Sequence, residues 1–268
     1  MMADTFTLST RNGGFRVAVR GDAGAPVLLL SNSLGATLEM WQGQIAAFSA
    51  THRVVCYDTR GHGGSPVTSG PYHFAGLGDD VLAVMDALEI DRAVFCGISM
   101  GGHTGLWLGV HAGERFSGLA VCNSAARIGT QQAWAERAAA VRSGRAEAMK
   151  ALAASAPERW FTPDFVRAQP AVVAKAQGWN AGIDPEGYAA CCEALGGSDL
   201  RGELGGIAVP TLLLAGEHDP VTTVADARAM HEAIAGSSLA SIAASHLSNL
   251  ETPQAFNQAL ARFMATLN

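Results

Sequence analysis

Hydrophobic and polar residues in the first 125 positions alternate between short apolar runs and stretches with helical spacing. Continuous apolar runs are typical of strands buried on both faces of a sheet. Such runs predict strands at 26–31, 53–57, 93–96 and 119–122. Two shorter runs, at 6–8 and 15–19, flank a Gly-rich turn and predict a hairpin. Apolar residues at helical spacing predict helices at 41–48, 77–88 and 101–111.

The second half of the chain breaks this rhythm and then resumes it. Residues 126–205 are Ala-rich and helical in pattern, with several Trp and Pro residues and no strong strand candidate. Strand signals return at 209–215 and 238–243, separated by a helix at 223–235 and followed by a helix after Pro253. The pattern predicts an α/β fold: a mostly parallel eight-stranded sheet flanked by helices. Its core comprises residues 1–125 and 206–268, and residues 126–205 form an inserted helical cap.

The composition is typical of a globular protein and argues against a membrane-spanning or secreted one. With 49% hydrophobic and 16% charged residues among 268, the chain can bury a sizeable core. No apolar run approaches the roughly 18 residues that span a bilayer, and the N-terminal residues lack a signal-peptide pattern. We therefore expect a cytoplasmic protein with no membrane partner.

Cysteine spacing and net charge indicate which cofactors, cross-links and partners the chain is not expected to have. The five cysteines form an odd set without a C-x-x-C pair, so we expect neither a metal site nor disulfides. A net charge of −6 without a basic stripe argues against a nucleic-acid partner. An anionic ligand would need a local positive group to offset the overall charge. Whether the chain forms a homo-oligomer is left open by the sequence.

The most informative stretch is Gly97-Ile98-Ser99-Met100-Gly101. It follows a predicted strand and precedes a predicted helix, which is the context of a G-x-S-x-G nucleophile elbow. Small residues on both sides of the serine let the strand and the helix approach closely. We expect Ser99 to be a nucleophile; the alternative is a serine in an ordinary Gly-rich turn.

A serine nucleophile requires a base to accept its proton and an acid to orient that base. In strand–elbow–helix hydrolases the order is Ser, acid, His, with each residue after a strand. Asp219 follows the run 211–215, and His246 follows the next predicted strand. Asp219 as a helix cap, Glu217 as the acid and His246 as a surface residue remain alternatives. His218 adjoins Asp219 too closely to bridge it to Ser99, and packing is the favoured role for His103.

Two backbone N–H groups should stabilise the oxyanion that forms during acyl transfer. One comes from the residue after the nucleophile, Met100, and the other from the loop after the third strand. Within the sequence Ser31-Asn32-Ser33-Leu34-Gly35, the N–H of Leu34 is the best candidate.

Taken together, these residues resemble the α/β-hydrolase superfamily. The segment Tyr57 to Ser65 resembles its D-x-R-G-x-G-x-S loop, which implies that Arg60 and His62 are structural. A closer resemblance is to the bacterial 3-oxoadipate enol-lactonase family. The segments of this chain that carry the resemblance are 31–35, 57–63, 95–102, 122–129 and 245–249. Residues 159–162 also resemble part of the cap of that family.

This resemblance implies that a small anionic lactone, the enol-lactone of 3-oxoadipate, is opened by water in aromatic catabolism. Neither a metal nor an organic cofactor is implied. We expect Arg127, at the cap boundary, to bind the substrate carboxylate, with Trp134 and Trp160 as pocket walls. The alternatives are an ion pair for Arg127 and cap packing for the tryptophans. Other functions that stay open are a carboxylesterase, a perhydrolase-type haloperoxidase and, more remotely, a non-catalytic receptor for a small ligand.

Overall fold

The computed structural model describes residues 5–267 and contains a single eight-stranded sheet in this range. Its strand order is β1-β2-β4-β3-β5-β6-β7-β8. The pairs β1–β2 and β2–β4 are antiparallel, and all later pairs in this order are parallel. The strands are β1 Thr5–Thr10, β2 Gly13–Arg20, β3 Val27–Ser31, β4 Arg53–Tyr57, β5 Ala93–Ile98, β6 Phe116–Cys122, β7 Thr211–Gly216 and β8 Ser238–Ile242. The predicted α/β fold with a mostly parallel sheet is confirmed.

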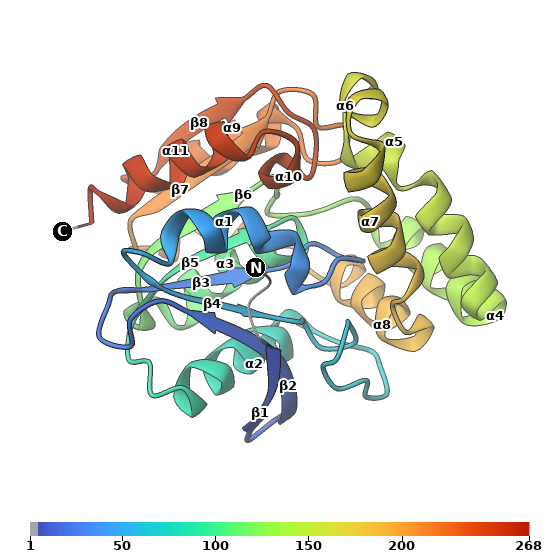
Figure 1. Cartoon of the computed structure of the whole chain (residues 1–268), viewed down its shortest axis with the longest axis horizontal. Helices are drawn as coiled ribbons and strands as arrows, with labels where there is room; N and C mark the ends of the chain where they lie inside the picture. The colour runs from blue at the N-terminus through green and yellow to red at the C-terminus, as the bar shows by residue number, and fades with distance from the viewer. Residues whose placement is uncertain (1–4, 268) are drawn as a thin grey trace.

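Helices cover both faces of the sheet (Figure 1). They are α1 Gln42–Phe48, α2 Phe74–Ala87, α3 Met100–His111, α9 Val224–Ala233, α10 Ser248–Glu251 and α11 Pro253–Met264, with 3₁₀ turns at Leu38–Trp41, Gly113–Arg115 and Leu204–Gly206. Because successive strand side chains point to opposite faces, Cys96 of β5 packs with α1 and α11, whereas Phe95 packs with α2, α3 and α9.

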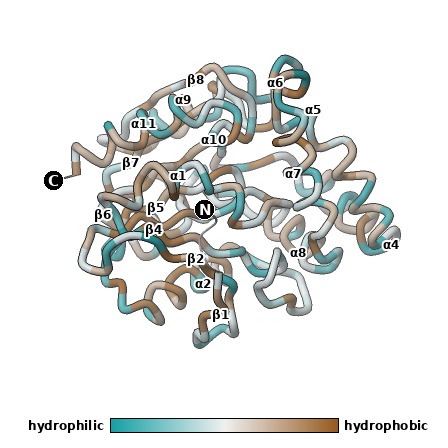
Figure 2. The backbone as a smooth tube through the Cα atoms, viewed as in Figure 1, coloured by the Kyte–Doolittle hydropathy of each residue, from teal (hydrophilic) through white to brown (hydrophobic). Residues whose placement is uncertain are grey.

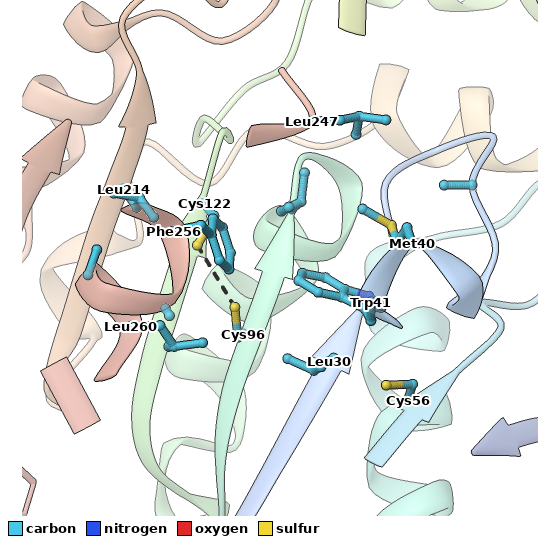
Figure 3. Close-up of a cluster of buried hydrophobic side chains, with 14 of the residues drawn as sticks. Leu30, Met40, Trp41, Cys56, Cys96, Cys122, Leu214, Leu247, Phe256 and Leu260 are labelled. Carbon is cyan, nitrogen blue, oxygen red and sulfur yellow. Dashed lines mark hydrogen bonds between the residues drawn. The ribbon is translucent and has the colours of Figure 1, made fainter. Parts of the chain in front are cut away.

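Buried apolar side chains fill the space between each sheet face and its helices. Figure 2 shows hydrophobic residues along β4 and the strands beside it, and hydrophilic ones on the outer turns around α6 (Pro163–Ala168). Figure 3 shows one such cluster, in which Trp41 and Phe256 pack over Cys96 and Cys122. The two thiol sulfurs lie 3.9 Å apart and are free. These cysteines therefore serve as small core residues.

The segment between β6 and β7 contains further helices, gathered on one side of the sheet (Figure 1). They are α4 Gln131–Ser155, α5 Pro157–Trp160, α6, α7 Pro170–Ala181 and α8 Pro185–Gly196. The long helix α4 packs mainly against α8 and α7. A separate hydrophobic cluster, which includes Tyr188 and Leu195, joins these helices to Leu34 and Met100 of the core. The helical segment thus rests directly on the residues expected to surround the nucleophile.

The described residues contain neither a membrane-spanning helix nor a cluster of metal-ligating side chains. No helix within residues 5–267 has the length and apolar character needed to cross a bilayer. The same residues contain no group of three or more His, Cys, Asp or Glu side chains arranged to hold a metal ion.

Candidate active site

Ser99 lies at the turn between β5 and α3 in a backbone conformation that few non-glycine residues adopt. Its φ is 56° and its ψ is −114°. Residues held in such sparsely populated regions persist only where the surrounding structure enforces them. A Cβ on Gly97 would lie 2.2 Å from the Gly101 carbonyl oxygen, and one on Gly101 would lie 2.3 Å from that of Ser31. Glycine at both positions is therefore what permits this sharp elbow.

The structure brings Ser99, Asp219 and His246 together. His246 Nδ1 donates a hydrogen bond of 2.8 Å to Asp219 Oδ2, and both side chains are buried. Ser99 and His246 line the same cavity of about 280 Å³. The Ser99 hydroxyl makes no hydrogen bond within residues 5–267, so it is free to approach a carbonyl. In many hydrolases the hydrogen bond from the nucleophile to its base tightens only when substrate is bound.

The Asp219 carboxylate is held by a dense set of donors. Its Oδ1 accepts hydrogen bonds from the backbone N–H groups of Val221 (2.8 Å) and Thr222 (3.1 Å). Its Oδ2 accepts from Thr222 Oγ1 (2.8 Å) and Asn123 Nδ2 (3.0 Å) as well as from His246. Burial alone would raise the pKa of Asp219, but the charge of His246 and these hydrogen bonds lower it to about 2. The carboxylate is therefore ionised at neutral pH and can orient an imidazole.

The rival acid and the other histidines lie in different surroundings. Glu217 is exposed, and its carboxylate accepts a hydrogen bond from Ser241 Oγ. His218 contributes to a cavity behind Asp219 rather than to the one that contains Ser99. His103 is buried against Phe74 and donates through Nδ1 to the Ala125 carbonyl. Only Asp219 therefore has the geometry of an orienting acid among these candidates.

The two expected oxyanion-hole donors are Met100, which directly follows Ser99 in the chain, and Leu34, which lines the cavity of Ser99. Met100 is the first residue of α3, so its N–H has no intrahelical acceptor. Leu34 lies in the loop after β3 and lines the cavity beside Ser99. Within residues 5–267 neither N–H donates a hydrogen bond. Two unpaired backbone donors beside a nucleophile are the arrangement that stabilises a developing oxyanion.

Arg127, the expected carboxylate ligand, does not line this cavity. Its guanidinium lies 3.4 Å from Asp199 and borders a separate surface cavity beside Arg201. Two other arginines take the expected place: Arg137 of α4 and Arg159 of α5 both line the cavity that contains Ser99. The side chain of Arg127 instead forms an exposed ion pair with Asp199, which also binds Arg201.

Trp134 and Trp160 line the cavity as expected. The indole Nε1 of Trp134 donates to the Ile128 carbonyl at 2.5 Å, and the Arg137 guanidinium lies 4.9 Å from its ring centroid. Trp160 is almost fully buried within the core cluster. Both tryptophans therefore combine packing with a share of the cavity wall.

Several residues at the site were not assigned a role from the sequence. Asn123 binds Asp219 and the Ser245 carbonyl through Nδ2, and its Oδ1 accepts from Ser248 Oγ at 2.5 Å. Its place in the 122–129 motif was the only sequence signal. Arg159 lay within the 159–162 motif without an assigned role, whereas nothing in the pattern of α4 distinguished Arg137 from its neighbours.

Two buried histidines near the site predict a pH-dependent stability. Burial lowers the pKa values of His62 and His103 to about 4, whereas an unfolded histidine titrates near about 6.5. Between these values the unfolded chain binds more protons, so the stability present above about pH 6.5 is lost as the pH falls toward about 4. Each histidine should contribute up to about 1.4 kcal/mol per pH unit.

Denaturant unfolding of the wild type and of His103→Gln across this pH interval would test the prediction. The variant should have a shallower dependence of unfolding free energy on pH, because one of the two titrating groups is absent. Identical slopes for the two proteins would contradict it.

The fold is that of the α/β-hydrolase class, and Ser99, His246 and Asp219 lie where this class carries its nucleophile, base and acid. Residues 26–253 match the family model described as alpha/beta hydrolase fold, and the chain belongs to this family. It is 48% identical to 3-oxoadipate enol-lactonase 2 of Acinetobacter baylyi, over 98% of this chain and 97% of that protein. It is 43% identical to 3-oxoadipate enol-lactonase 1 of the same organism, over 94% and 93%. The crystal structure of the enol-lactonase from Burkholderia xenovorans LB400 superposes with a TM-score of 0.94 at 42% identity, covering 97% of this chain and 100% of that one.

Proposed function

We propose that this protein is a carboxylic-ester hydrolase that opens the enol-lactone of 3-oxoadipate with water to give 3-oxoadipate. The observation that carries the assignment is the 48% and 43% identity to two 3-oxoadipate enol-lactonases over nearly the whole length of each chain. This reaction belongs to bacterial catabolism of aromatic compounds. The same relatives do not favour a carboxylesterase, a perhydrolase-type haloperoxidase or a non-catalytic receptor.

In the proposed mechanism, Ser99 Oγ attacks the lactone carbonyl while His246 accepts the hydroxyl proton and Asp219 holds the imidazole. The N–H groups of Leu34 and Met100 stabilise the tetrahedral oxyanion. Collapse of this intermediate breaks the ring C–O bond and leaves an acyl-enzyme. The released enolate stays attached through the carbon chain and takes up the proton that His246 accepted from Ser99, which gives the ketone and returns His246 to its neutral form. His246 then activates a water molecule that hydrolyses the acyl-enzyme and frees Ser99.

Arg137 and Arg159 are the proposed ligands of the substrate carboxylate. Neither guanidinium forms a salt bridge within residues 5–267, although both line the cavity of Ser99. Burial and the positive charge of Arg137 lower the pKa of Arg159. A bound carboxylate would relieve both unfavourable effects. Such a local pair of cations is what an anionic substrate needs in a chain of net charge −6.

Arginine variants would test this carboxylate site. Arg137→Gln and Arg159→Gln should each lower kcat/KM for the lactone by roughly ten- to hundredfold, since a hydrogen bond to a charged group contributes about 1.5–3 kcal/mol. The loss should appear mainly in KM. Arg127→Gln is the matched control, because that side chain pairs with Asp199 outside the cavity. Hydrolysis of a neutral aryl acetate should be insensitive to all three changes. An equal loss on both substrates would contradict the assignment.

Product identification would test the reaction itself. The purified protein should consume the lactone, followed by the loss of enol-lactone absorbance, with stoichiometric appearance of 3-oxoadipate by NMR. A protein that leaves the lactone unchanged while it hydrolyses simple aryl esters would instead be a general carboxylesterase.

A cytoplasmic location is part of the proposal. All five cysteines are free, and Cys96 and Cys122 remain thiols although their sulfurs are 3.9 Å apart. Unpaired thiols are the usual state of proteins in reducing compartments.

A further inference from the structure

The loop that carries the Leu34 N–H is anchored to the core at its first residues. Asn32 Oδ1 accepts a hydrogen bond of 2.9 Å from Trp41 Nε1, and Asn32 Nδ2 donates to the Tyr57 carbonyl at 3.1 Å. Ser31 Oγ lies 2.8 Å from the Tyr57 hydroxyl. Figure 3 shows Trp41 in the same cluster as Leu30, the residue of β3 that precedes Ser31. The loop is thus fixed before Leu34 by contacts that involve only the core.

Beyond Leu34, the same loop is held from two opposite directions at Gly35. The Gly35 N–H donates to His62 Nε2 at 2.9 Å, and the Gly35 carbonyl accepts from Asn180 Nδ2 at 3.3 Å. Gly35 has a φ of +80°, and a Cβ there would lie 2.0 Å from Asn180 Nδ2. His62 belongs to the core, whereas Asn180 belongs to α7 in the segment between β6 and β7. One glycine therefore joins the oxyanion loop to both parts of the molecule.

Asn180 lies at a buried position where an apolar residue would stabilise the fold better. It is 2% exposed, and its Oδ1 has no hydrogen-bond partner within residues 5–267. A buried polar atom without a partner destabilises the folded state. A leucine, which has the same branching and the same number of side-chain heavy atoms, would avoid that penalty. Asn180 lines the cavity of Ser99, and the hydrogen bond that its amide makes there is the one from Nδ2 to the Gly35 carbonyl.

We infer that Asn180 is a positioning residue for the oxyanion hole, acting through Gly35 on the N–H of Leu34. The hydrogen bonds from Asn180 and to His62 fix the backbone on the far side of Leu34, while Asn32 fixes the near side. Docking of the helical segment is thereby coupled to assembly of the oxyanion hole. The inference rests on the proposed serine chemistry at Ser99, but it does not depend on which ester is the substrate.

The test compares Asn180→Leu with Gln177→Ala, a matched control on the same helix. Gln177 is half-buried and binds the Ala153 carbonyl without contacting the oxyanion loop. The substrate is p-nitrophenyl acetate, so the result is independent of lactone specificity. Phenylboronic acid is the second probe, because its tetrahedral adduct with Ser99 places an oxygen in the oxyanion hole.

Asn180→Leu should lower kcat by roughly ten- to hundredfold, as expected for a displaced catalytic donor. Phenylboronic acid should bind more weakly by a similar factor, while KM and the melting temperature stay close to wild type. Gln177→Ala should change none of these quantities. Unchanged kcat and boronate affinity in Asn180→Leu would overturn the inference. So would a loss of activity that is matched by Gln177→Ala or by a lowered melting temperature, since either would indicate a structural role.

Discussion

Replacement of Ser99 by alanine is expected to lower kcat for lactone opening by about six orders of magnitude. The hydroxyl is the only group at the elbow that can form the proposed acyl-enzyme, and it faces the cavity that it shares with His246. Because alanine is no larger than the serine that it replaces in the turn between β5 and α3, the melting temperature should change little. Single-turnover and steady-state assays of the purified variant would measure the loss.

The same variant separates catalysis from ligand binding. Ser99→Ala should still bind the lactone, because Arg137 and Arg159 are untouched by the substitution. Isothermal titration with the variant should therefore give a dissociation constant near the wild-type KM. Retained turnover would remove Ser99 from the mechanism, and a receptor would keep its biological response in the absence of the hydroxyl.

The second large effect is expected for Asp219→Asn, which should lower kcat by about four orders of magnitude. The Asp219 carboxylate accepts a hydrogen bond from His246 Nδ1–H, and this hydrogen bond leaves Nε2 unprotonated and free to act as the base. An asparagine that presents its amide to His246 would favour the wrong tautomer. The substitution would also remove the negative charge of the Asp219 carboxyl group, whose pKa is lowered to about 2 in this site.

Glu217→Gln is the matched control for that substitution. Glu217 lies two residues away but is exposed, and its carboxylate binds Ser241 rather than His246. Its variant should keep wild-type kcat. Near-normal activity in Asp219→Asn together with a large loss in Glu217→Gln would reassign the acid of the triad.

Much of the fold was predictable because the sheet is buried on both faces. Apolar runs such as the one in β3 and helical periodicity such as that of α2 leave strong local signals. The hairpin of β1 and β2 was predicted from its Gly-rich turn. Strand order and the antiparallel pairing of β2 with β4 depend on long-range contacts, and they became visible only in the structure. Helix boundaries shifted by a few residues, as where α2 begins at Phe74 rather than at Leu77.

The residues of the candidate site also fall into a group that was predictable from the sequence and a group that was not. Ser99, Asp219 and His246 were predictable because each directly follows a strand, and parallel strands bring those ends to one edge. Residues on the helical segment had no such constraint. Arg127 was expected in the cavity from its sequence position, but its side chain lies outside the cavity and pairs with Asp199. Which arginines and which asparagine reach the site depends on how α4, α5 and α7 pack.

The most direct test of the account is the ratio of kcat/KM for the 3-oxoadipate enol-lactone to that for p-nitrophenyl acetate, measured on the same preparation. The account predicts a lactone value on the order of 10⁵ M⁻¹ s⁻¹ or above, within the usual range for a natural substrate. The neutral aryl ester should be slower by at least about two orders of magnitude, because it cannot engage Arg137 and Arg159. A ratio near or below one would contradict the assignment as an enol-lactonase.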